Sequence, residues 1–446
     1  MSRSQNRYLI PFIVLALIAI IGIFSPSGAS VPTESVPIDP GDVAWMLSAS
    51  GLVLLMTPGL AFFYGGMVRY KNLVSTLIQN FISLGIVSLV WLVIGFSLAF
   101  GSDIGGLIGN PGSFFMFKDV GLSVRPEFAA KVPFALFAMF QLKFAIITPA
   151  LITGGVAERV RFSSLMLFIV LFSIFIYAPL AHWTWHPAGF LHKWGVLDFA
   201  GGTVVHISAG FAALAGAMFL GRRATASHAH TPTNIPFVVI GTGLLWFGWF
   251  GFNAGSSLAA DGLAITAFVN TNFASATAML TWVMLDGVSG RKRSVVGACV
   301  GAVVGLVAIT PAAGFVNVGQ SVFIGFIAPV VSYFAVQYKS KTNIDDTLDV
   351  FPCHGVGGIV GMILTAVFAK DVGLVYGQST TFLYHLLALL IVSVFTFGGS
   401  YLLFMLTDYM LPLRVSALQE SEGLDTTQHG ETATDWKERV NGTHTA

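Results

Sequence analysis

Long apolar runs alternate with short polar connections along most of this chain. From Val43 onward, eleven runs are long enough to cross a bilayer as helices, which takes about 20 apolar residues each. Their approximate limits are 43–65, 73–100, 133–157, 162–183, 201–220, 234–254, 263–285, 294–311, 321–338, 354–369 and 381–407. The pattern predicts an all-α polytopic membrane protein with eleven transmembrane helices.

The N-terminus follows a different pattern. Arg3 and Arg7 flank the start of an apolar run at 8–24, and the small residues of SPSGAS come next. This order is typical of a secretory signal peptide, cleaved after Ala29 or Ser30; an uncleaved first helix is the alternative. The predicted organisation is a signal peptide at 1–30, an external arm at 31–42, a transmembrane domain at 43–411 and a cytoplasmic tail at 412–446.

Composition and charge narrow the class of protein further. Hydrophobic residues make up 55% of the chain and charged residues only 10%, which excludes an ordinary soluble globule. The net charge of +1 provides no basic stripe for phosphates, so no nucleic-acid partner is expected. Eleven Lys or Arg residues fall in the connections on one side of the membrane and five on the other. The positive-inside rule then places the mature N-terminus outside and the C-terminus in the cytoplasm.

Two histidines lie within apolar, glycine-rich runs: His206 in DFAGGTVVHISAG and His354 in FPCHGVGG. An ionisable side chain at membrane depth is costly unless it is paired or lines a polar path, so the two indicate a conducting site. They fall in the fifth and tenth runs. This placement fits two units of five helices, inverted relative to each other, with a central pore between the halves. The eleventh helix would pack around the outside.

Enzyme chemistry and metal binding find no support in the sequence. It contains no nucleophile–base constellation, metal triad or nucleotide loop, so neither an enzyme nor a cofactor is expected. Cys299 and Cys353 lie far apart in apolar runs, as small buried side chains do. Two histidines without a third ligand make a poor zinc site.

Several motifs lie in and between the apolar runs. They are, in order, MTPGLAFFYGGMVRYKN, FQLKFAIITPALITGGVAERVRF, DFAGGTVVHISAG, WFGFNAGS, AFVNT, VGLVAITPAAGFV and HGVGGIVG. Together they resemble the motifs of the ammonium transporter family (Amt/Mep/Rh), especially its bacterial and archaeal Amt branch, and the resemblance runs from about Val43 to Gly430. The resemblance implies a homotrimer in the inner or plasma membrane, with a narrow pore in each eleven-helix subunit.

The chemistry of such a pore follows from its substrate. Ammonium and potassium have similar size and the same charge, so a filter of carbonyl groups would separate them poorly. Removing a proton separates them, because potassium has none to lose. With an ammonium pKa of about 9, deprotonation at pH 7 costs roughly 3 kcal/mol in bulk water, and an apolar pore disfavours the cation further.

The resemblance also assigns roles to individual residues. An ammonium-binding vestibule near the outer face would consist of Phe140, Phe144, Trp185 and the hydroxyl of Ser256, using cation–π attraction worth about 0.5–2 kcal/mol. Phe144 and Phe252 would form the gate below it. The two tryptophans of HWTWHPAGF leave Trp183 as an alternative to Trp185.

The remaining assignments concern the two histidines and two charged residues. His206 and His354 would form a twin-histidine pair that shares one proton, because an imidazole offers a donor and an acceptor nitrogen. Asp198 precedes AGGTVVHIS, where a carboxylate caps a helix start, so we expect a structural role near the site. Lys143, beside the gate, departs from the uncharged residue usual in the family, and we expect it to point away from the pore.

The predicted function is that of an ammonium transporter that binds the cation at the outer vestibule, deprotonates it and conducts ammonia past the twin histidines into the cytoplasm. A non-transporting ammonium sensor and a passive ammonia channel are the alternatives. The tail contains EGLDTTQHGE, which resembles the regulatory tail of the family. The resemblance implies a PII signalling protein as a partner at the cytoplasmic face, and Asp425 and Glu431 are expected to pair with Arg159, Arg161 or Arg222.

Overall fold

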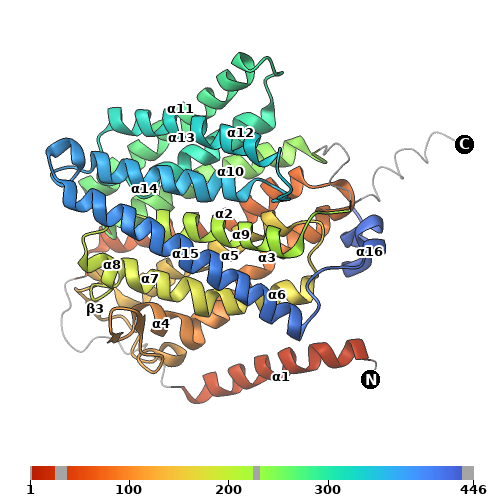
Figure 1. The fold of residues 1–446 in the computed structure, drawn as a ribbon. Helices are drawn as coiled ribbons and strands as arrows, with labels where there is room; N and C mark the ends of the chain where they lie inside the picture. Colours follow the sequence, from red (N-terminus) through yellow and green to blue (C-terminus); the bar gives the residue numbers. More distant parts are fainter. Residues whose placement is uncertain (1–2, 26–37, 225–231, 434–446) are drawn as a thin grey trace, which may run out of the picture.

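The protein is a bundle of long helices that run roughly side by side (Figure 1). The computed structural model describes residues 3–25, 38–224 and 232–433. The helices of the bundle, with the segments that continue them, are α2 (Pro40–Met67), α3 (Leu73–Val90) with η2 (Trp91–Gly95) and α4 (Phe96–Phe100), α5 (Phe134–Val156), α6 (Phe162–Phe172) with η4 (Ser173–Tyr177) and α7 (Ala178–Trp185), η5 (Gly202–Ile207) with α9 (Ser208–Leu220), α10 (Ile235–Ala254), α11 (Gly262–Val288), α12 (Val295–Ile309), α13 (Val318–Lys339), η7 (Phe351–Val356) with α14 (Gly357–Phe368), and α15 (Ser379–Met410). The predicted class, an all-α polytopic membrane protein, is confirmed.

Ten of these helical stretches in the described residues are long and apolar enough to cross a membrane. The exception among the eleven predicted spans is α12, which has 15 residues and a length of about 23 Å, short of a hydrocarbon core of about 30 Å. The chain continues from it through turns, and Thr310 and Ala312 are fully buried there. Irregular backbone at this depth is tolerated when protein surrounds it.

The two ends of the bundle carry different structures. The hairpin face bears β1 (Asp103–Ile104) paired with β2 (Ile108–Gly109), β3 (Val124–Arg125) paired with β4 (Ala129–Pro133), and the short turns η3 (Phe115–Phe117), α8 (Phe190–Lys193), η6 (Gly255–Ser257) and η8 (Leu374–Tyr376). The opposite end, the tail face, bears η1 (Tyr70–Asn72), α16 (Ala417–Glu422) and η9 (Asp425–His429). Both strand pairs are antiparallel.

The N-terminal segment forms α1 (Arg3–Phe24), which lies along the outside of the bundle (Figure 1). Its side chains from Leu9 onward are mostly exposed. The expected cleavage site at residues 29–30 and most of the expected arm lie outside the described residues. Asp39 begins the described chain of the bundle by capping α2, with Oδ1 accepting from the amides of Gly41 and Asp42. Cleavage of the segment stays a prediction.

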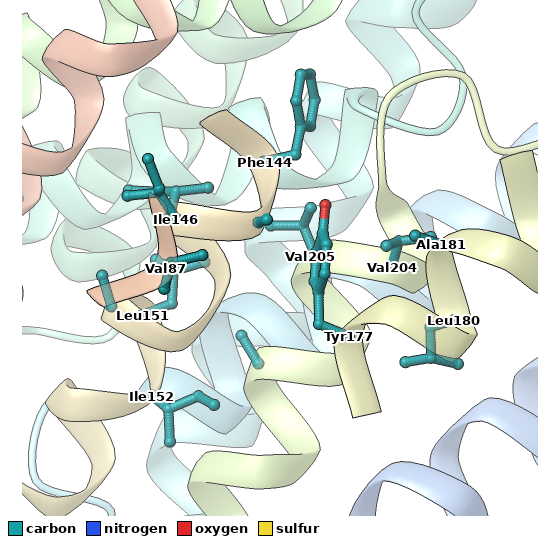
Figure 2. Packing of buried hydrophobic residues seen from close by; sticks show 14 of the residues in the cluster. Val87, Phe144, Ile146, Leu151, Ile152, Tyr177, Leu180, Ala181, Val204 and Val205 are labelled. Atoms are coloured by element: carbon teal, nitrogen blue, oxygen red, sulfur yellow. The ribbon is translucent and has the colours of Figure 1, made fainter. Parts of the chain in front are cut away.

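Buried apolar side chains pack around α5. Figure 2 shows Ile146, Leu151 and Ile152 of α5 in the same group as Val87 of α3, while Phe144 stands apart from these aliphatic side chains. The other labelled side chains come from η4, α7 and η5. This packing buries α5 from Phe144 to Ile152.

Candidate functional site

The two histidines lie on η5 and η7, the segments that begin α9 and α14. Both segments are π-helical, a form that recurs at functional sites. Gly210 of α9 lies directly against Gly355 of η7, where a Cβ atom on Gly210 would come within 2.3 Å of the Gly355 nitrogen. Only glycine allows two backbones to approach so closely. The contact brings the side chains of His206 and His354 together.

The histidine pair is buried and in direct contact. The two Nδ1 atoms lie 3.3 Å apart, and the ring centroids are 5.4 Å apart at an angle of 30°. His206 is 1% exposed and His354 is 3% exposed. Because a hydrogen bond between two nitrogens needs one donor and one acceptor, the pair holds one proton between these atoms. His206 Nε2 is buried without a partner among the described residues, which leaves it available to a small polar guest.

Aromatic rings cover the pair on the side of the hairpin face. Phe144 of α5 and Phe252 of α10 pack ring against ring, with 4.3 Å between centroids. The Phe252 ring lies 6.0 Å from that of His206. Phe140 and Trp185 contact Phe144 edge-on, at 5.0 and 5.7 Å. The stacked phenylalanines therefore separate the histidines from the hairpin face.

A cavity of about 120 Å³ lies on the other side of this stack. Its lining includes all four residues predicted for the vestibule: Phe140, Phe144, Trp185 and Ser256. The Ser256 hydroxyl donates its hydrogen to the carbonyl of Phe252 at 2.8 Å, so its own oxygen remains an acceptor. Trp183, the alternative to Trp185, packs elsewhere against Phe190 and Phe395.

On the tail-face side, His354 lines a second, much smaller cavity of about 10 Å³. This volume is about what one water molecule requires. Its other lining residues are mostly apolar: Phe63, Tyr64, Val300, Val303, Leu348 and Cys353. The pair thus lies between an aromatic cavity with polar groups and a narrow apolar one. In the described part of the chain, no three His, Cys, Asp or Glu side chains are placed to hold a metal ion.

Asp198 has the geometry of a helix cap. Its Oδ1 accepts from the amides of Gly201 and Gly202 at 2.8 and 2.6 Å, and its Oδ2 accepts from the amide and the hydroxyl of Thr203. The backbone carbonyl of Asp198 also accepts from Trp185 Nε1 at 3.1 Å. The carboxylate therefore holds the start of η5, and with it the position of His206, while its neighbouring carbonyl orients the vestibule tryptophan.

The chain as a whole is similar to known proteins. Residues 44–434 match the Ammonium Transporter Family. The chain belongs to this family. It is 45% identical to a putative ammonium transporter of Methanothermobacter thermautotrophicus (89% of this chain, 98% of that protein) and 46% identical to an ammonium transporter of Aquifex aeolicus (89% and 94%).

Solved structures agree with the family. The crystal structure of Saccharomyces cerevisiae Mep2 superposes with a TM-score of 0.81 at 34% identity, covering 88% of this chain and 92% of that one. A structure described as a sensor Amt protein gives a TM-score of 0.81 at 30% identity, covering 87% and 98%. The chain is thus similar both to a protein of the Mep branch and to a sensor.

Sequence reasoning missed one ring at the centre of this ammonium transporter family member. Trp249 of α10 stacks on His206, with 5.4 Å between centroids and an angle of 19°. Its Nε1 donates to the hydroxyl of Thr310 at 2.9 Å, which fixes the orientation of the ring. The only signal in the sequence was its place in WFGWFGFN, one turn before Phe252.

The expected ion pairs of the tail are wrong in part. Among the described residues, no arginine pairs with Asp425; its carboxylate accepts from the amides of Val74 and Ser75 at 3.0 and 2.8 Å, at the start of α3. Unpaired amides at a helix start bind a carboxylate well, and they take the place of the predicted arginines. Glu420, another acid of the described part of the tail, does pair with an arginine and lies 3.0 Å from Arg414.

A buried ion cluster joins the connections of the tail face. Arg223 contacts Glu158 at 2.6 Å and makes a two-pronged contact with Asp345 at 2.8 and 2.9 Å. Burial alone would raise the pKa of Asp345, but the hydrogen bonds and charge of Arg223 outweigh it and hold that pKa at about 2. Asp346, next in sequence, accepts from the amides of Val350 and Phe351. The cluster therefore reaches the start of η7, which carries His354.

Proposed function

We propose that this protein transports ammonium by binding the cation in the aromatic cavity, removing its proton at the gate and conducting ammonia past His206 and His354. The single observation that carries the proposal is the buried pair of Nδ1 atoms 3.3 Å apart, with a cavity on each side. A ring-lined cavity suits a cation, through attraction to the ring faces. The apolar cavity of about 10 Å³ suits a small neutral molecule and disfavours a charged one.

The chain's own residues supply each step of the proposed path. Phe140, Phe144 and Trp185 offer ring faces and edges, and the Ser256 oxygen accepts a hydrogen from the cation. The stacked rings of Phe144 and Phe252 must part, and the charged form meets the highest barrier there. The histidine pair accepts the proton, because one imidazole nitrogen of a ring can accept while the other donates, and releases it toward the cytoplasm, where it rejoins the ammonia. Potassium is excluded because it has no proton to give.

The test is ammonium uptake by the protein in reconstituted vesicles, comparing the wild type with His206→Ala and His354→Ala. We expect either variant to lose ammonium-selective uptake or to admit potassium. His192→Ala, a replacement in exposed α8, serves as the matched control. Unchanged flux and unchanged selectivity in both pore variants would exclude the twin-histidine role.

A second candidate function is ammonium sensing, favoured by the likeness to the sensor Amt protein. A sensor would bind ammonium at the same cavity without turnover. Binding that is saturable in detergent, together with no uptake in vesicles, would support the sensor. A passive ammonia channel is the third candidate function, and it would be distinguished by ammonia flux that carries no electrical current.

The assembly and its surroundings are proposed on the basis of the family. We infer a homotrimer in the inner or plasma membrane, with the hairpin face outside and the tail face in the cytoplasm, as the distribution of basic residues predicts. A PII signalling protein would bind at the tail face. Mass measurement of the purified protein and co-elution with PII proteins of the host test these two points.

A further inference from the structure

The mouth of the aromatic cavity contains a carboxylate that the proposed mechanism does not use. Glu127 lies in the turn between β3 and β4 and lines the cavity together with Phe128 and Phe137. Among the described residues that line this cavity it is the one with a charged side chain. Its side chain is 51% exposed, so it faces both the solvent and the cavity.

The nearest cation to Glu127 is held to one side by aromatic rings. The guanidinium of Arg125 lies 4.8 Å from the centre of the Phe134 ring and 5.2 Å from that of Phe114. Its separation from the Glu127 carboxylate is 4.0 Å, the outer limit of an ion pair, and exposed pairs of this kind are weak. Arg125 does not line the cavity. The described lining of the cavity therefore includes the carboxylate and not the guanidinium.

Deeper in the same cavity, a buried amide has an unused acceptor. Gln141 lies between Phe140 and Phe144 on α5, lines the cavity and is 9% exposed. Its Oε1 has no hydrogen-bond partner among the described residues. A half-turn of the amide would exchange this oxygen with Nε2, which is not among the buried atoms without a partner, and would break no bond that the oxygen makes. A buried carbonyl without a donor is costly, and a cation N–H would satisfy it.

We propose that Glu127 and Gln141 form a cation-capture path that feeds the aromatic cavity: the carboxylate attracts a monovalent cation at the mouth, and the amide oxygen accepts one of its N–H groups further in. The inference rests on the proposed function and adds to it two residues that set the affinity for the substrate. Capture by charge raises the local concentration of every small cation. The carboxylate therefore also makes potassium a competitor at the mouth, although potassium goes no further.

The experiment measures ammonium uptake against ammonium concentration at low ionic strength in reconstituted vesicles. Glu127→Gln should raise KM about fivefold and leave kcat unchanged, because a charge a few ångströms away in water is worth a factor of this size. Glu127→Asp should restore most of the affinity.

Arg125→Met, which removes the opposing charge, should lower KM. Gln141→Met, similar in volume, should raise KM, and potassium should compete less well in Glu127→Gln.

Two comparisons decide the outcome. Asp119→Asn removes an exposed carboxylate from the same connection, outside the cavity lining, and should leave KM unchanged. A KM for Glu127→Gln equal to that of the wild type, or an equal rise in Asp119→Asn, overturns the inference. Unchanged transport in His206→Ala and His354→Ala would instead overturn the proposed function, whatever Glu127→Gln does, so the two failures are distinguishable.

Discussion

Lys143 follows Leu142 on α5 and immediately precedes Phe144, a ring of the proposed gate. It is partly exposed on the protein surface and does not line either of the two cavities beside the histidine pair. Its charge therefore lies outside the proposed route of the substrate. Lys143→Met, which keeps a long apolar stem, should leave ammonium uptake within about threefold of the wild type, because no charge near the path is removed. A large rise in uptake would show that Lys143 obstructs the path.

Individual residues differed in how well the sequence revealed them. His206 and His354 could be found because an ionisable group in an apolar run is conspicuous. Trp249 could not, because one ring among nine tryptophans carries no sign of what it stacks on. Gln141 was also missed, since an unused acceptor is visible only once its neighbours are placed. Such pairing and stacking depend on the tertiary structure, which brings together residues that are far apart in the sequence.

At the scale of elements, Arg223 joins the end of α9 to the connection before η7. Its two partners, Glu158 and Asp345, are 2% and 9% exposed. Arg223→Met would remove the cation that binds Asp345 and one of the two arginines near Glu158, whose other one is Arg69 at 3.9 Å. Breaking a buried ion pair by removing one partner typically costs about 3–5 kcal/mol. We expect a clear loss of thermal stability in detergent at pH 7. The exposed Arg222→Met is the matched control and should melt like the wild type.

The same contact predicts how the stability of the protein depends on pH. The carboxyl pKa of Asp345 is about 2 in the folded protein, below the ordinary value of 3.8. The contribution of this carboxylate to the free energy of unfolding is therefore complete above about pH 4 and is lost as the pH falls toward about 2. The wild type should lose melting temperature over this interval, and Arg223→Met should lose less. Equal acid sensitivity in the two proteins would contradict the assignment.

Element boundaries were predictable where the apolar pattern was continuous. Every predicted run contains a helix, because in a bilayer the backbone of such a run must satisfy its own hydrogen bonds. The strand pairs of the connection at 101–133 were not predicted, since three of the four strands have two residues and the fourth only five, too few for a periodicity to be detected. The contact of Asp425 with α3 was also out of reach, because it joins residues about 350 positions apart.

At the scale of the whole molecule, the segments that carry the two histidines meet inside the bundle. Four helical stretches precede η5 and four more separate α9 from η7, and Gly210 of α9 touches Gly355 of η7. The sequence order predicted the equivalent places of the two histidines in the fifth and tenth stretches, and the inverted relation of the two halves stays a prediction. The order of the runs could not predict the stacked rings of Phe144 and Phe252 or the narrow apolar cavity beside His354. In the proposed function these two features favour a neutral species over a charged one.

The measurement that tests this claim most directly is the electrical current across a bilayer that contains the wild-type protein. If ammonium gives up its proton and both products cross by separate routes, a step in ammonium concentration should produce an inward current, and an equal step in potassium should produce none. Ammonia flux without current would show passive conduction. A potassium current as large as the ammonium current would contradict deprotonation at the gate altogether.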